Sequence, residues 1–178
     1  KRFSGAIWYL SHDAFSIMTR GRQVMIDRKW NIYLAGEIHT KWRDEIASGA
    51  CKLELPVNFF MPVTDHAASD NCGVEILGDE ESAFWKDHKG AKINAIRTRT
   101  LIRNADLIVV RFDDHYRQWN AAFDAGFAVA IDKPLIVMHP PELSHALKEV
   151  NAAALAVAEH PGQVVEVLQY VCTRGMVG

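Results

Sequence analysis

Residues 107–112, LIVVRF, form a short run that is apolar throughout its first half. This is typical of a buried parallel strand, which has side chains packed on both of its faces. An amphipathic stretch at 91–104 precedes the run, and a stretch rich in alanine and phenylalanine follows it at 119–131. Both stretches predict helices. Helix, buried strand and helix in succession indicate an α/β protein.

The rest of the chain continues this alternation. Further apolar runs predict strands at 30–35 (WNIYLA), 57–63 (VNFFMPV) and 134–139 (PLIVMH), with helices at 41–51, at 143–150 and from Pro161 onward. Residues 152–158 are compatible with a helix or with a short fifth strand, and 64–90 predicts a long irregular loop. We expect a single doubly wound domain, Rossmann-like or flavodoxin-like, with a mostly parallel sheet of about five strands. Residues 1–24 are expected to form an N-terminal extension and 25–178 the domain.

Composition excludes several classes of protein. The formal net charge of −2 lacks the basic surplus that proteins binding a nucleic-acid polymer usually carry. The three cysteines are far apart and form no C-x-x-C pair, so we expect a reducing, cytoplasmic location without disulfides. No apolar run approaches the roughly 20 residues needed to cross a bilayer, so no membrane association is expected.

Three polar segments stand where a parallel sheet of this kind binds ligands, beyond the carboxyl ends of its strands. They are residues 36–40 after the first strand, 64–72 after the second, and 113–120 after the third. The last of these leads directly into the helix that carries Asp124. The cleft is therefore expected where these segments converge.

Several stretches resemble a known family. Residues 33–36 (YLAG), 105–110 (ADLIVV), 120–128 (NAAFDAGFA) and 133–137 (KPLIV) are similar to segments of nucleoside 2-deoxyribosyltransferases. More closely, residues 33–171 resemble the YtoQ group of that superfamily. The distinctive pieces are 33–40, 62–66 with 70–78, 84–100 and 118–126.

The resemblance implies a nucleophile. The superfamily places a carboxylate two residues before a helix glycine, and here that residue is Asp124, where relatives usually have Glu. A carboxylate suits attack on an anomeric carbon, and we expect its helix position and a hydrogen bond from Tyr33 to keep the pKa of Asp124 low. The alternatives are that Asp124 only caps or solvates its helix, and that Tyr33 is an ordinary strand tyrosine with a buried ring.

The same resemblance implies a rebuilt substrate pocket. Thr98 stands where relatives often carry an Asp, and residues 118–120 replace their sugar- or phosphate-binding elements. An anionic ligand is expected if Arg97 faces the cleft, although two solvated arginines would explain Arg97 and Arg99 equally well. The candidate substrate-binding residues are Gly36, Glu37, His39, Asp65, His66, Arg97, Gln118, Trp119 and Asn120.

Within this set, Asp65 or His66 could transfer a proton, and Trp119 could stack on a base or pack in a core or an interface. Asx turns that hold the 64–72 segment in shape are the plainer interpretation. No metal site is expected, because the spacing of Asp65 and His66 with residues 70–72 (Asp, Asn and Cys) matches no established ligand pattern and a second histidine pair is missing.

Two hypotheses of function follow. The first is an enzyme, without cofactor, that cleaves the N-glycosidic bond of a nucleoside or nucleotide through Asp124. It would be a hydrolase with water as acceptor and a transferase with a second base. The second is a nucleotide- or sugar-binding module that has lost the chemistry. The resemblance also implies a homodimer or a higher homo-oligomer.

Overall fold

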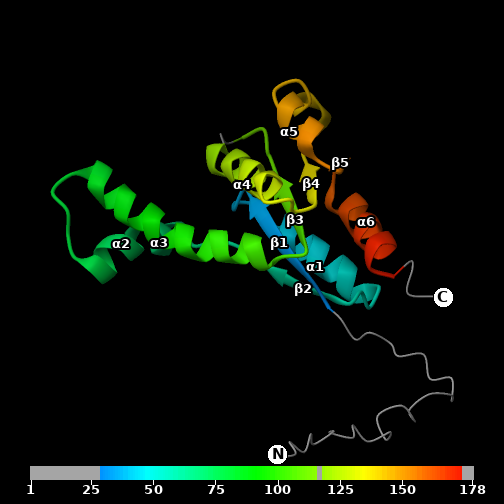
Figure 1. Ribbon diagram of the computed structural model, residues 1–178, viewed down its shortest axis with the longest axis horizontal. Helices are drawn as coiled ribbons and strands as arrows, with labels where there is room; N and C mark the ends of the chain where they lie inside the picture. Colours follow the sequence, from blue (N-terminus) through cyan, green and yellow to red (C-terminus); the bar gives the residue numbers. More distant parts are fainter. Residues whose placement is uncertain (1–28, 116–117, 174–178) are drawn as a thin grey trace, which may run out of the picture.

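The computed structural model describes residues 29–115 and 118–173, which form a five-stranded parallel sheet (Figure 1). The strands are β1 (Trp30–Gly36), β2 (Val57–Phe60), β3 (Leu107–Arg111), β4 (Leu135–Met138) and β5 (Ala156–Ala158). Their order across the sheet is β2-β1-β3-β4-β5, with every neighbouring pair parallel. This is the flavodoxin-like order, and its topological switch point lies between β1 and β3. The predicted doubly wound fold is confirmed.

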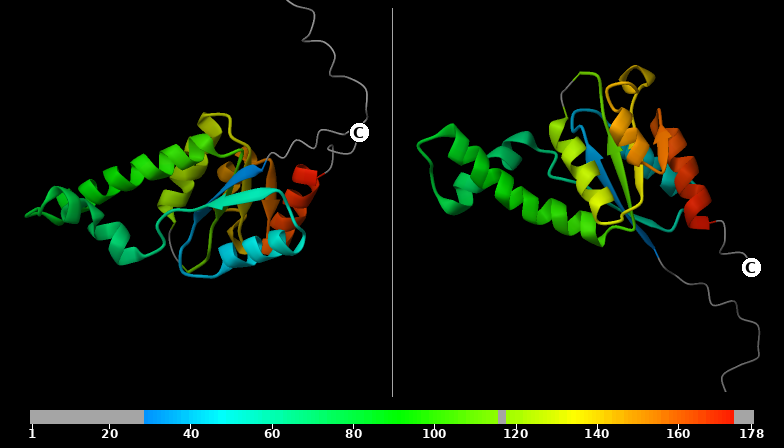
Figure 2. Two further views of the ribbon diagram at one scale, coloured as in Figure 1. Left: turned by 90° about the horizontal axis from the view of Figure 1, so that it is seen from below. Right: turned by 45° about the horizontal axis from the view of Figure 1, so that its top comes forward.

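Helices cover both faces of the sheet, because the strand side chains alternate between two cores (Figure 2). On one face, Ile32 and Leu34 of β1 pack in a core with α1 (Trp42–Lys52) and α6 (Pro161–Thr173). On the other face, Tyr33 and Ala35 pack with α4 (Trp119–Ala130) and the end of α3 (Ala83–Asn104). Apolar runs in β3 and β4 therefore supply both cores at once.

The predicted irregular loop at 64–90 is wrong. This segment contains α2 (His66–Leu77) and the first turns of α3, which begins at Ala83 rather than at residue 91. The two helices form a hairpin that projects from the sheet layer (Figures 1 and 2). They cross closely at Gly73 and Gly90, where an added Cβ on Gly73 would collide with the Gly90 backbone. Polar and apolar residues are mixed along α2 without a clear helical period, and the helix packs against α3.

The region after β4 also differs in detail from the prediction. A short 3-10 turn (Pro141–Leu143) and α5 (Lys148–Ala153) replace a single helix at 143–150, and the ambiguous stretch resolves into the end of α5 followed by β5. The proposed extension at 1–24 lies outside the described residues. None of the described helices is long and apolar enough to cross a membrane.

Gly36 ends β1 with a φ of +115°, in the region that favours glycine. A Cβ at this position would also collide with the backbone of Arg111 on the neighbouring strand. The close approach of β1 and β3 at the switch point therefore requires glycine here.

We predict that Gly36→Ala lowers the free energy of unfolding by about 1–3 kcal/mol, because it adds both backbone strain and a collision. Gly126→Ala is the matched control, since a Cβ there meets nothing within 4 Å on helix α4. The control should leave stability unchanged or raise it by up to about 1 kcal/mol. Urea denaturation of both variants measures the difference, and equal stabilities would contradict the assignment.

Candidate active site

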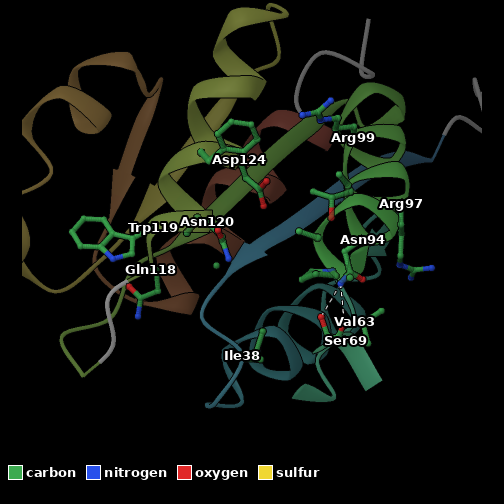
Figure 3. Close-up of a pocket in the computed structure, with 18 of the residues that line it drawn as sticks. Ile38, Val63, Ser69, Asn94, Arg97, Arg99, Gln118, Trp119, Asn120 and Asp124 are labelled. Atoms are coloured by element: carbon green, nitrogen blue, oxygen red, sulfur yellow. Dashed lines mark hydrogen bonds between the residues drawn. The ribbon is translucent and has the colours of Figure 1, made fainter. Parts of the chain in front are cut away.

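A cleft of about 1180 Å³ opens beyond the carboxyl ends of β1 and β3. Its walls come from the segment after β1, from α3, from the first half of α4 and from the start of α2 (Figure 3). The site thus lies at the topological switch point, where open parallel sheets bind their ligands. Its volume accommodates a ligand of the size of a nucleotide.

The segment that leaves β1 is held by a buried arginine. Arg43 donates to the carbonyl oxygens of Leu34 (Nε, 3.1 Å), Gly36 (Nη2, 3.1 Å) and Glu37 (Nη1, 2.6 Å). Trp42 Nε1 donates to the same Glu37 carbonyl at 3.0 Å. Burial lowers the pKa of Arg43 to about 10, which still leaves it charged at neutral pH. The backbone at the floor of the cleft is therefore fixed.

The Glu37 carboxylate also makes its contacts within the protein. It accepts hydrogen bonds from the backbone N–H groups of His39 (2.7 Å) and Thr40 (3.0 Å), and from the Thr40 hydroxyl. Arg111 Nε lies 3.3 Å from Glu37 Oε1 in an ion pair. Burial alone would raise the pKa of Glu37, but these donors and the guanidinium outweigh it and hold the pKa below its usual value. Glu37 therefore shapes the cleft through contacts that both of its carboxylate oxygens make within the protein.

Arg111 joins this network to the loop that follows β3. Its Nη2 donates to Asp113 Oδ2 at 3.1 Å, and Asp113 Oδ1 accepts from the His115 N–H at 2.9 Å. The Asp113 N–H donates to Gln118 Oε1 at 2.9 Å, which places Gln118 at the entrance to α4. Burial raises the pKa of Asp113, but these hydrogen bonds and Arg111 outweigh it and lower the pKa. The loop leading to Asp124 is thereby tied to the end of β1.

Asp124 lies on α4 and lines the cleft, with its carboxylate directed between α4 and α3 (Figure 3). It accepts no hydrogen bond and has no ion-pair partner among the described residues. Burial raises its pKa to about 6. The expectation of a lowered pKa is wrong for a physical reason: Asp124 is in the second turn of α4, beyond the reach of the helix dipole, which acts within the first turn.

Tyr33 is fully buried beneath the cleft, on the face of β1 that contacts α3 and α4. Burial, together with the nearby charge of Asp124, raises its pKa to about 12, while the adjacent Thr98 hydroxyl and two arginines act in the opposite direction. Its hydroxyl is near Asp124 and Thr98 but makes no well-aligned hydrogen bond with a described residue. The expected Tyr33–Asp124 hydrogen bond is absent among the described residues, although the two groups are neighbours.

Of the other predicted site residues, most line the cleft and Asp65 does not. Asp65 does not line the cleft: it is the N-cap of α2, and its side chain accepts from the Ala68 N–H at 2.9 Å. His66 lines the cleft and lies 2.9 Å from Asp70, and Trp119 is 72 % exposed at its edge, which excludes a core position within the chain. The predicted residues that line the cleft are Gly36, Glu37, His39, His66, Arg97, Gln118, Trp119, Asn120 and Asp124.

Sequence reasoning missed the residues that organise the site. Arg43 is one of several charged residues on a helix, and Arg111 ends an apolar strand, so neither has a distinguishing pattern. Asn94 was missed as well: its amide donates to the Ser69 carbonyl (3.0 Å) and hydroxyl (3.1 Å), which joins α3 to α2 along the cleft. The Cys72 thiol lies 3.2 Å from the Ser69 carbonyl oxygen in the same part of the structure.

The flavodoxin-like sheet, with a carboxylate-bearing cleft at its switch point, defines a doubly wound α/β protein with a candidate site for a small molecule. The chain belongs to the family described as nucleoside 2-deoxyribosyltransferase YtoQ, whose model matches residues 33–172. It is 43% identical over 139 residues to the uncharacterized protein YtoQ of Bacillus subtilis (strain 168), covering 78% of this chain and 94% of that protein.

The crystal structure of a conserved protein from Enterococcus faecalis V583 has the same fold, with a TM-score of 0.55, 13% identity, and 81% of this chain and 99% of that chain covered. The 2-deoxyribosyltransferase of Bacillus psychrosaccharolyticus aligns with a TM-score of 0.47 and 17% identity, over 78% of this chain and 95% of that chain.

We predict that Glu37→Gln lowers the free energy of unfolding at pH 7 by about 1–3 kcal/mol, because it removes a buried, hydrogen-bonded charge. The folded-state pKa of Glu37 is lowered, so its contribution is present above the usual carboxyl pKa and is lost as the pH falls through the folded value. The difference in the free energy of unfolding between the variant and the wild type should therefore become smaller in acid. Urea denaturation at several pH values measures it, with the exposed Glu149→Gln as control.

Proposed function

We propose that this protein cleaves or transfers the N-glycosidic bond of a nucleoside or nucleotide, with the Asp124 carboxylate as nucleophile. The observation that carries the proposal is the state of Asp124: a carboxylate that faces a large cleft, is largely removed from water and has no partner among the described residues. A carboxyl group that only capped a helix would accept backbone hydrogen bonds, as Asp65 does. Membership of the family supports the substrate class.

In the proposed reaction, an oxygen of the ionised Asp124 forms a bond to the anomeric carbon of the sugar. The bond from that carbon to the base nitrogen breaks, and the base leaves with the bonding electron pair and takes up a proton. Attack by water on the sugar–Asp124 ester then gives hydrolysis, whereas attack by a second base gives transfer. The site suits an oxocarbenium-like transition state because a carboxylate charge acts more strongly where water is excluded.

Two neighbours are proposed to assist. Tyr33 keeps its proton at neutral pH, so its hydroxyl is a donor beside Asp124 and would act as a positioning residue for the carboxylate. His66 is the proposed proton donor to the departing base, because it lines the cleft and Asp65 is occupied as a helix cap. Asp124 is about one bond shorter than the usual Glu, roughly 1.5 Å, so the sugar has to lie correspondingly closer to helix α4.

A binding module without chemistry is the second candidate. The observation that favours it is the composition of the cleft, where Thr98 takes the place of an acid and the Gln118-Trp119-Asn120 sequence replaces the sugar-binding element of the transferases. Mass spectrometry of the protein after incubation with substrate distinguishes the two candidates. A sugar covalently bound to Asp124 would exclude the binding module.

We predict that Asp124→Asn abolishes release of free base from a panel of nucleosides and nucleotides followed by chromatography, lowering the rate by at least about a hundredfold. In the wild type, kcat/KM should rise with pH through about 6 and then level off, because only the ionised carboxylate attacks.

Asp87→Asn is the matched control, because Asp87 is another cleft-lining acid but lies on the projecting part of α3. It should retain base release within a few fold. Equal loss in both variants, or base release that is independent of Asp124, would remove Asp124 from the nucleophile role.

The family resemblance also leads us to propose a homo-oligomer. Four large apolar side chains near the tip of the α2–α3 hairpin are 52–66 % exposed: Ile76, Leu77, Phe84 and Trp85. Clustered apolar exposure of this kind marks surfaces that bind other proteins.

We predict that the wild type sediments as a dimer or a larger oligomer. Replacement of Phe84 and Trp85 together by serine should shift it toward the monomer, because the variant loses apolar area that assembly would bury. Analytical ultracentrifugation measures both states, and a monomeric wild type at micromolar concentration would contradict the proposal.

A further inference from the structure

Two arginines of α3 converge on one aromatic ring of α4. The Cζ atoms of Arg99 and Arg103 are 6.0 Å and 5.4 Å from the centroid of the Phe127 ring. All three residues line the cleft that contains Asp124, and Arg99 extends from α3 toward α4 (Figure 3). Contacts of this geometry are cation–π interactions, which hold a guanidinium in place without neutralising its charge.

This pair of positive charges has no acidic partner. Neither Arg99 nor Arg103 lies within ion-pair distance of a carboxylate among the described residues, and two like charges one helical turn apart repel each other. Burial is the cause of the raised pKa of Asp124, with no contribution from either guanidinium. The cleft therefore holds two solvent-exposed cations that have no carboxylate partner among the described residues and are available to an anion.

The distance from these two arginines to Asp124 fits the phosphate group of a nucleotide. Phe127 is one turn after Asp124 on α4, which puts their Cβ atoms roughly 5–6 Å apart on the same face of the helix. In a nucleoside 5′-monophosphate, the phosphorus is separated from the anomeric carbon by part of the sugar ring and the 5′ carbon and oxygen. A sugar placed for attack by Asp124 can therefore extend its phosphate toward Arg99 and Arg103.

We propose that Arg99 and Arg103 form an anion subsite that binds the 5′-phosphate, so that the substrates are nucleoside 5′-monophosphates rather than nucleosides. This inference rests on the proposed function for the position of the sugar. Guanidinium groups bind phosphate oxygens through paired N–H donors, and two of them match the charge of a phosphate dianion. Arg97, the arginine expected in this role, points away from Asp124 instead, with its Nη2 3.5 Å from the Met61 carbonyl oxygen (Figure 3).

The test measures binding and base release separately. Isothermal titration calorimetry with 2′-deoxynucleoside 5′-monophosphates, the matching nucleosides and inorganic phosphate should show the nucleotides binding at least tenfold more tightly than the nucleosides. The double variant Arg99→Gln, Arg103→Gln should lose that preference and leave nucleoside affinity unchanged. Added NaCl should weaken nucleotide binding by the wild type more than by the variant, because it screens the charge pair.

Two further variants separate charge from packing. Arg99→Lys with Arg103→Lys keeps both charges and should retain part of the preference for nucleotides over nucleosides. If the two arginines only pack on Phe127, the wild type itself would show no such preference. Lys52→Gln with Lys148→Gln removes two charges outside the cleft and should bind nucleotides like the wild type.

Equal affinity of the wild type for nucleotides and nucleosides overturns the subsite, and so does parallel loss of both affinities in the double glutamine variant. A wild type that releases base from nucleosides but shows no nucleotide preference retains the proposed function and loses this inference. A wild type that prefers nucleotides through the two arginines but releases no base retains the subsite and loses the proposed chemistry.

Discussion

The buried guanidinium of Arg43 fixes the point from which the rest of the site is built. It donates to the carbonyl oxygens of Leu34 and Gly36 in the last residues of β1 and of Glu37 immediately after the strand. Once that backbone is set, Glu37 is held in position to cap the following turn and to pair with Arg111 on β3. Arg111 in turn restrains Asp113, which binds Gln118 at the start of α4. The position of the helix carrying Asp124 thus depends on a chain of polar contacts that starts at Arg43.

The charged groups around the cleft therefore have two different roles. Glu37 pairs with Arg111 and accepts backbone hydrogen bonds, Arg43 donates to backbone carbonyl oxygens, and the pKa of Glu37 is lowered because its ionised form is stabilised. Asp124 is in the opposite state, with no described partner and a raised pKa. The polar contacts thus hold the floor of the cleft, whereas the acid on its wall has no partner among the described residues and is available to a ligand. Arg99 and Arg103 also have no carboxylate partner among the described residues, but their side chains are exposed to solvent.

Much of the fold could be predicted from sequence because the strands at 30–35, 107–112 and 134–139 are apolar on both faces, which few other structures require. The α2–α3 hairpin could not, because the apolar residues of α2 follow no clear helical period and the helix packs on α3 at Gly73 and Gly90 through contacts that no local pattern encodes. At the site, Asp124 and the polar segments were found by position after strands and by resemblance. Arg43 and Arg111 were not, since an arginine that binds distant carbonyls has the same local sequence as one in solvent. The raised pKa of Asp124 depends on burial by several elements at once, which sequence does not specify.

Asp124 is buried without a hydrogen-bond or ion-pair partner among the described residues, and this lowers the stability of the whole molecule. Raising its pKa from 3.8 to about 6 disfavours the ionised form inside the fold by about 3 kcal/mol, at 1.36 kcal/mol per unit. In the unfolded chain the same carboxylate is hydrated and ionises freely, so at neutral pH this residue favours unfolding, and in acid it does not. A typical domain has only about 5–15 kcal/mol of net stability, so one side chain offsets a sizeable share of it. The polar network around Glu37 and the two apolar cores therefore offset the destabilisation that comes from burying the ionised Asp124 in the wall of the cleft.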